Sequence, residues 1–75
     1  MKYQSKHYVV CVKNEGYEVS LERRKIYRII PDKKAAEQDL IRIVDESGQS
    51  YLYPNHYFVG IRLPQLILRA LTRAA

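Results

Sequence analysis

A chain of 75 residues holds one domain with a small core, because a protein of this size buries only about 60% of the surface that its unfolded form exposes. Its content of 47% hydrophobic and 28% charged residues excludes a disordered chain, and its single cysteine, Cys11, excludes an internal disulfide or a cysteine-based metal cluster. The net charge of +5 attracts anionic partners, although many modestly basic proteins bind no nucleic acid.

Three strands are predicted in the first part of the chain. Residues 7–13 are apolar and β-branched at their centre, so we expect a strand buried on both faces. Residues 17–22 alternate strictly and predict a half-buried strand or an extended arm of a loop. That alternation places three side chains on one face, namely Tyr17, Val19 and Leu21. Residues 25–30 predict the third strand, with Tyr27 and Ile29 facing one way.

A loop and a fourth strand follow. Residues 33–38 are polar and contain alanine, and Asp32 is a possible helix cap. The segment is too short for a stable helix, so we expect a mobile loop. Residues 39–45 predict a strand in which Ile41 and Ile43 face inward.

The stretch D-E-S-G-Q-S-Y-L-Y-P-N-H-Y-F at residues 45–58 predicts a hairpin followed by a second turn. Gly48 supplies the positive φ that a tight hairpin turn often needs. A short aromatic strand is expected at residues 50–53, and Pro54 ends it because proline has no backbone N–H to donate. Residues 58–62 predict the last strand.

The apolar period changes from two to about 3.6 at Pro64, which predicts a C-terminal helix over residues 64–74. The apolar stripe of this helix consists of Leu63, Leu66, Ile67, Ala70, Leu71 and Ala74. A helix of this length is marginal alone, so the stripe must pack against something. It either caps an open end of the sheet in a monomer, or meets a partner, which makes the protein a homodimer or docks it on a larger subunit.

Five to six short strands with regular turn signals predict a mainly β fold in a single domain over residues 1–75. A small barrel of antiparallel strands over residues 7–62 is the economical architecture at this length, with the helix at 64–74 appended to it. No apolar run approaches the roughly 20 residues of a membrane span, and the first residues lack the apolar stretch of a signal peptide. We therefore expect a cytoplasmic protein without a membrane partner.

The hairpin resembles the end of a Src-homology-three (SH3) domain. In that family a turn glycine, an aromatic-aliphatic strand and a P-x-x-Y motif lead into the last strand, and G-Q-S-Y-L-Y-P-N-H-Y-F is similar to that ending. Residues 18–30 are similar to the family's E-L-S-F segment, basic diverging turn and following strand. The resemblance covers residues 8–61 and implies an SH3-like barrel with a one-turn 3₁₀ element. The chain also resembles small bacterial proteins that carry D-E-S-G and Y-L-Y-P, a likeness that implies no activity.

The resemblance to SH3 domains also implies something about ligands. Family members bind proline-rich peptides through tyrosines of the first strand, a tryptophan that opens the third strand, and the Pro and Tyr of P-x-x-Y. Here Pro54 and Tyr57 occupy the last pair. V-C-V stands where the tyrosines are expected, the chain has no tryptophan, and Asp39 or Leu40 falls at the tryptophan position. Two walls of the groove are missing, so the resemblance implies the fold but not polyproline recognition.

Catalysis, a metal site and a cofactor are not expected. Apart from serines, the only nucleophile is Cys11, which lies inside a predicted strand, and there is no glycine-rich phosphate loop. His7 and His56 without a defined acidic partner are weak evidence for a metal site. The adjacent Asp45 and Glu46 point to opposite faces of a strand end, so they do not predict a pair of catalytic carboxylates.

The first of two functions that fit this sequence is a non-enzymatic protein-interaction module, either an adaptor or an accessory protein. Tyrosine offers a broad apolar surface with a polar tip, which suits contacts with a peptide. The predicted groove for a partner protein or peptide consists of Tyr17, Asp39, Tyr51, Pro54 and Tyr57. Acidic side chains beside it, at positions 39, 45 and 46, favour a basic or polar peptide.

The alternative function is a small-barrel nucleic-acid-binding protein. It uses exposed tyrosines to stack on bases and a basic turn to contact phosphates, with Arg23, Arg24, Lys25 and Arg28. This function predicts that binding weakens steeply as the salt concentration rises. The same four charges also fit a solvated turn that keeps a sheet edge soluble.

Overall fold

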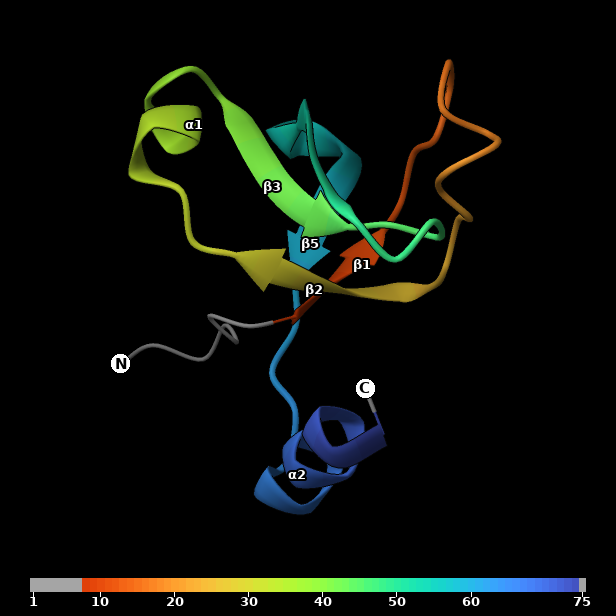
Figure 1. Cartoon of the computed structure of the whole chain (residues 1–75), viewed down its shortest axis with the longest axis vertical. Coiled ribbons are helices and arrows are strands. Elements are labelled where there is room, and N and C mark those ends of the chain that lie inside the picture. Colours follow the sequence, from red (N-terminus) through yellow and green to blue (C-terminus); the bar gives the residue numbers. More distant parts are fainter. Residues whose placement is uncertain (1–7, 75) are drawn as a thin grey trace.

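The computed structural model describes residues 8–74, without the side chains of residue 68 and residues 71–74. The protein is mainly β, with five antiparallel strands in one sheet in the order β4-β3-β2-β1-β5 (Figure 1). The elements are β1 (Tyr8–Cys11), β2 (Ile26–Ile30), α1 (Lys33–Glu37), β3 (Leu40–Val44), β4 (Ser50–Pro54), the 3₁₀ turn η1 (Asn55–Tyr57), β5 (Phe58–Gly60) and α2 (Gln65–Ala74). The expected short antiparallel strands, one-turn 3₁₀ element and C-terminal helix are therefore confirmed.

The sheet does not close into the barrel that we expected. In the described part of the chain, β4 and β5 are its two edges, and β5 pairs with β1 from Val9↔Gly60 to Cys11↔Phe58. Closure requires strands long enough to tilt and stagger around a common axis. A β5 of three residues and a β1 of four residues are too short to bring the two edges together.

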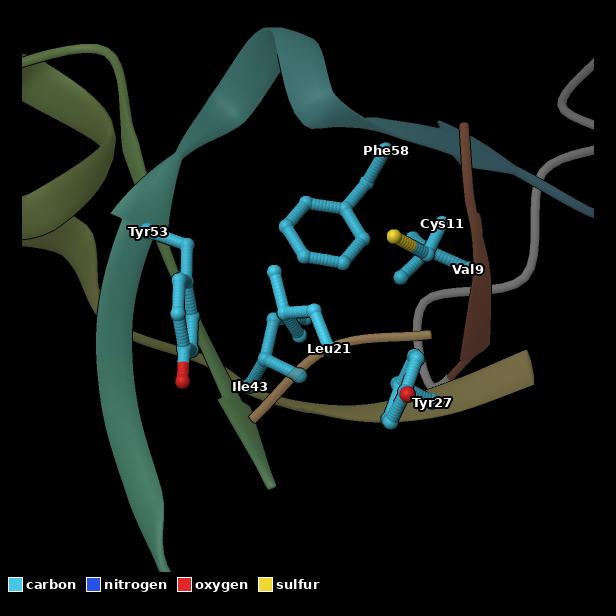
Figure 2. Close-up of a cluster of buried hydrophobic side chains, with 7 residues drawn as sticks. All are labelled: Val9, Cys11, Leu21, Tyr27, Ile43, Tyr53 and Phe58. Atoms are coloured by element: carbon cyan, nitrogen blue, oxygen red, sulfur yellow. The ribbon is translucent and has the colours of Figure 1, made fainter. Parts of the chain in front are cut away.

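The core collects one or two side chains from every strand. Strand alternation turns these side chains to one face of the sheet, where a leucine from the loop between β1 and β2 joins them. The buried cluster consists of Val9, Cys11, Leu21, Tyr27, Ile43, Tyr53 and Phe58 (Figure 2). The expected inward positions of Ile41 and Ile43 are confirmed, and Tyr27 and Ile29 share one face as predicted. Cys11 is fully enclosed, and burial raises the pKa of its thiol, as expected of an inert cysteine.

The first strand is shorter than predicted. It ends at Cys11, and Val12 beyond it is exposed, while the predicted start at His7 lies outside the described residues. Tyr8 and Val9 are both buried, so both faces of β1 are covered where it begins.

The alternating residues 17–22 form a compact turn, and the strand predicted there is wrong. The backbone N–H groups of Ser20 and Leu21 both donate to the carbonyl oxygen of Tyr17, at 3.0 and 2.8 Å. These bonds form a turn in which side chains four residues apart point to the same side, in place of the two-residue alternation of a strand. Tyr17 and Leu21 therefore share a side. Leu21 is buried, whereas Val19, predicted to face the same way, is 98% exposed.

The loop predicted at residues 33–38 contains a short helix, α1. The Asp32 carboxylate caps it by accepting the backbone N–H of Ala35 at 3.0 Å, and it also pairs with the Arg42 guanidinium of β3 at 2.9 Å. The Ala35 N–H and then Arg42 lower the pKa of Asp32. Ala35 is buried. Contacts with β3 therefore stabilise a helix that its length alone would not support.

Replacing Asp32 with alanine is expected to lower the melting temperature by roughly 4–8 °C, because it removes a helix cap and the partner of Arg42. Thermal unfolding followed by far-ultraviolet circular dichroism measures the change. Asp32→Asn keeps a capping oxygen and should recover part of the loss, and Lys33→Ala, an exposed change in the same helix, should have little effect. Equal melting temperatures for Asp32→Ala and Lys33→Ala would contradict this role.

Helix α2 stands apart from the sheet, below β5 in Figure 1, and does not form the cap that was one of the two expected roles. Three described side chains of the predicted stripe are exposed, Leu66 at 77%, Ile67 at 47% and Ala70, and Leu63 is half-buried. Leu71 and Ala74 belong to the residues whose side chains are not described. Neither described helix has the length and apolar character needed to cross a bilayer. The apolar side chains that the structure describes within α2 are therefore exposed.

Candidate aromatic binding surface

Two partly exposed tyrosines from distant parts of the sequence meet over a buried third. The ring of Tyr17, in the loop between β1 and β2, lies edge-on to Tyr57 with centroids 5.9 Å apart. The same ring lies edge-on to Tyr53 at 5.0 Å, and Tyr53 belongs to the core. Both geometries are favourable for aromatic pairs. We call Tyr17 and Tyr57 the aromatic pair; it offers apolar ring surface on a rigid support.

Hydrogen bonds hold the loop between β1 and β2 against η1. The backbone N–H groups of Val12 and Lys13 donate to the carbonyl oxygen of Tyr57, at 2.8 and 3.3 Å. In the other direction, the Tyr57 hydroxyl donates to the carbonyl oxygen of Glu15 at 2.9 Å. Pro54, with φ of −59°, leads the chain into η1 and so sets the position of Tyr57. The aromatic pair is thus fixed from both sides.

A buried carboxylate supports the aromatic pair from beneath. Asp45 is 6% exposed, and its Oδ2 accepts the Tyr53 hydroxyl at 2.5 Å while its Oδ1 accepts the Ser47 backbone N–H at 2.8 Å and the Ser47 hydroxyl at 2.5 Å. Burial disfavours the charged form, but these bonds outweigh it and lower the pKa of Asp45. The Tyr53 and Ser20 hydroxyls are also hydrogen-bonded, at 2.9 Å. Burial, then the bond to Asp45, raises the pKa of Tyr53 to about 12.

The neighbouring carboxylate, Glu46, joins the basic turn to the hairpin. It pairs with the Lys25 ammonium at 2.7 Å and accepts the Tyr27 hydroxyl at 2.6 Å. The bond from Lys25 and then the bond from Tyr27 lower the pKa of Glu46. Asp45 and Glu46 therefore both have hydrogen-bond partners within the chain, and their lowered pKa values keep both carboxylates charged.

The other predicted groove residues lie along the β3–β4 hairpin. Asp39 precedes β3 with a positive φ of 59°, and its carbonyl oxygen accepts the Asn55 N–H at 2.9 Å. Pro54 lies opposite Leu40 in the same end of the hairpin. Tyr51 is 51% exposed and lies opposite Ile43, closer to the Gly48 turn. The structure thus brings Asp39 and Pro54 to the η1 end of the hairpin and leaves Tyr51 further along β4.

Sequence reasoning missed two acidic residues near the aromatic pair. The Tyr57 hydroxyl donates to the backbone carbonyl oxygen of Glu15, and Glu18 directly follows Tyr17. Desolvation, followed by the charges of Glu15 and Glu18 and by Tyr17, raises the pKa of Tyr57. The available signal was the composition of residues 14–22, which contain three glutamates and no basic residue.

The four predicted phosphate contacts do not form one uniform patch. All four side chains are exposed, but Lys25 forms an ion pair with Glu46. Arg24 has a positive φ of 69°, and its backbone N–H donates to the carbonyl oxygen of Cys11 at 2.7 Å, which closes the loop. Arg28 lies on β2, so the arginines extend from the loop end onto the sheet.

Comparison of the chain with protein-family models, with curated proteins and with solved structures found no match in any of the three. The functional interpretation therefore rests on the geometry of this chain.

Proposed function

We propose that this protein is an SH3-like protein-interaction module that binds a segment of a partner protein without catalysis. Its proposed site is the aromatic pair with the nearby hairpin positions Asp39, Tyr51 and Pro54. Three features support the SH3-like interpretation: the β2–β3–β4 meander, the return of β5 to β1, and the 3₁₀ turn between β4 and β5 at P-x-x-Y. The open sheet makes it a partial likeness.

The aromatic pair is the observation that carries this proposal. Tyr17 is 37% exposed, yet its ring is fixed against Tyr53 and Tyr57. Rigid tyrosine side chains lose little conformational entropy on binding and often dominate the energy of protein interfaces. Glu15 and Glu18 beside the pair favour a segment with arginine or lysine among its apolar residues.

A displayed library of random peptides, selected on the full chain, tests this function. We expect selected peptides to combine a basic residue with apolar residues, and Tyr17→Ala or Tyr57→Ala to weaken their binding at least about tenfold. Fluorescence anisotropy measures the affinities. Glu18→Lys is a second test that does not depend on how well the tyrosine variants fold. It changes an exposed side chain outside the core and should weaken the binding of basic peptides.

Val59→Ala is the matched control, because Val59 is 51% exposed and lies on β5 outside the proposed site. The proposal fails if Glu18→Lys and folded Tyr17→Ala bind the selected peptides as tightly as Val59→Ala does. Nucleic-acid binding through the exposed Arg23, Arg24 and Arg28 is the alternative, and an oligonucleotide titration at several salt concentrations distinguishes it.

A further inference from the structure

The loop that carries Tyr17 presents an exposed apolar side chain and two acidic residues near the aromatic pair. Val19 is 98% exposed, two residues from Tyr17. The charges of Glu15 and Glu18 act on Tyr57, whereas Glu22 acts on Lys25 of the basic turn that follows. A partner that covers the aromatic pair and this loop must supply apolar side chains and positive charge together.

The C-terminal part of the same chain has the complementary chemistry. Residues 47–75 contain three arginines and no acidic residue, whereas all eight acidic residues lie before position 47. Within α2, Leu66 is 77% exposed, Ile67 is 47% exposed and Arg69 is exposed. Leu66 and Arg69 are three residues apart, so the helix presents an exposed apolar side chain and a cation on the same side.

Helix α2 and the aromatic pair of one molecule lie at opposite ends of the structure. Strand β5 runs away from η1, and α2 follows it after residues 61–64 (Figure 1). Gln65 lies eight positions after Tyr57, so at most about 26 Å can separate them at roughly 3.3 Å per residue. Because α2 lies on the far side of the sheet from η1, its exposed side chains face away from the aromatic pair of its own chain (Figure 1).

We propose that α2 of one molecule docks on the aromatic pair and the neighbouring Glu15 and Glu18 of a second copy of this chain. Leu66 packs on Tyr17 and Tyr57, and Arg69, on the same side of the helix, lies beside Glu15 and Glu18. This inference rests on the proposed function, because it uses the same site and names a second copy as the partner. Two different surfaces meet, so the contact is head-to-tail.

Head-to-tail contacts have a recognisable behaviour in solution. They form a closed ring when the rotation between copies permits, and otherwise an open chain whose mass increases with protein concentration. A helix of ten residues presents a small interface, so the association is weak and fast. Its dependence on carboxylate–guanidinium attraction makes it weaker at high salt.

Mixing two variants of the full chain tests the proposal by sedimentation. Glu18→Lys impairs the loop and keeps the helix, while Leu66→Ser with Arg69→Glu impairs the helix and keeps the loop; all three side chains are exposed. Wild type should self-associate at high micromolar concentration. Each variant alone should stay at the monomer mass of 8.9 kDa, and an equimolar mixture should form a complex of twice that mass.

The affinity in the mixture should match that of wild type within about threefold, and it should fall severalfold between roughly 50 and 500 mM salt. A Glu18→Lys variant that associates as strongly as wild type overturns the proposal, because helices would then be pairing with helices. Wild-type protein that remains monomeric at about 500 μM also overturns the proposal, because a weak specific contact forms at lower protein concentrations. Neither outcome affects capture of library peptides by the aromatic pair, so the two proposals can fail separately.

Discussion

Replacing Leu21 with alanine is expected to destabilise the domain by about 2–5 kcal/mol, the range for deleting a buried leucine side chain. Leu21 is 1% exposed and lies beside Ile43 at the centre of the core (Figure 2). Its backbone carbonyl also accepts the Asn14 side-chain amide at 3.1 Å. Since small domains have only about 5–15 kcal/mol of total stability, the loss is a large fraction of it.

The same loop supplies a matched control. Val19→Ala changes a side chain that is 98% exposed and should alter the free energy of unfolding by less than about 0.5 kcal/mol. Urea denaturation followed by tyrosine fluorescence compares the two, since the chain has seven tyrosines and no tryptophan. Similar denaturation midpoints for Leu21→Ala and Val19→Ala would show that residues 17–22 form the extended arm that alternation predicts.

The turns of this protein were predictable because they depend on the chemistry of neighbouring residues. Gly48 adopts the expected positive φ of 86°, and Pro54 leads into the expected 3₁₀ turn. Strand faces were predictable for the same local reason, as Tyr27 and Ile43 show. Tyr17 and Tyr57 were named in one predicted groove, and the structure brings their two rings into contact.

The errors of prediction arise where a contact distant in sequence overrides a local pattern. Apolar and polar residues alternate over residues 17–22, yet this segment forms a turn. The Asn14 side-chain amide donates to the Leu21 carbonyl oxygen, and the Leu21 side chain is buried. Helix α1 depends on the contact of Asp32 with Arg42, ten residues away. Barrel closure depends on strand length, and the apolar pattern of a sequence does not fix the end of a strand to better than about two residues. Asp45 is buried because it accepts the Tyr53 hydroxyl, a contact between residues eight positions apart.

Replacing Asp45 with asparagine is expected to cost about 1–3 kcal/mol near neutral pH, because a buried charged acceptor loses strength in its bonds to Tyr53 and Ser47. Asparagine has nearly the same volume as aspartate, so the effect reports on charge rather than on a cavity. Loosening Tyr53 should also loosen Tyr17, which packs on its ring. Urea denaturation near pH 6 measures the loss of stability.

The cost of Asp45→Asn should disappear in acid, and this separates the role of the charge from a packing defect. The folded pKa of Asp45 lies below its ordinary value of 3.8, so its contribution is fully present above that value and is lost as the pH falls through the folded pKa. The difference in stability between wild type and Asp45→Asn should therefore shrink steadily as the pH falls below 3.8. Asp39→Asn is the control, an exposed carboxylate whose positive φ asparagine tolerates, and it should change little near pH 6. A gap between wild type and Asp45→Asn that is unchanged across this acid range would mean that shape, rather than charge, holds Tyr53 beneath the aromatic pair.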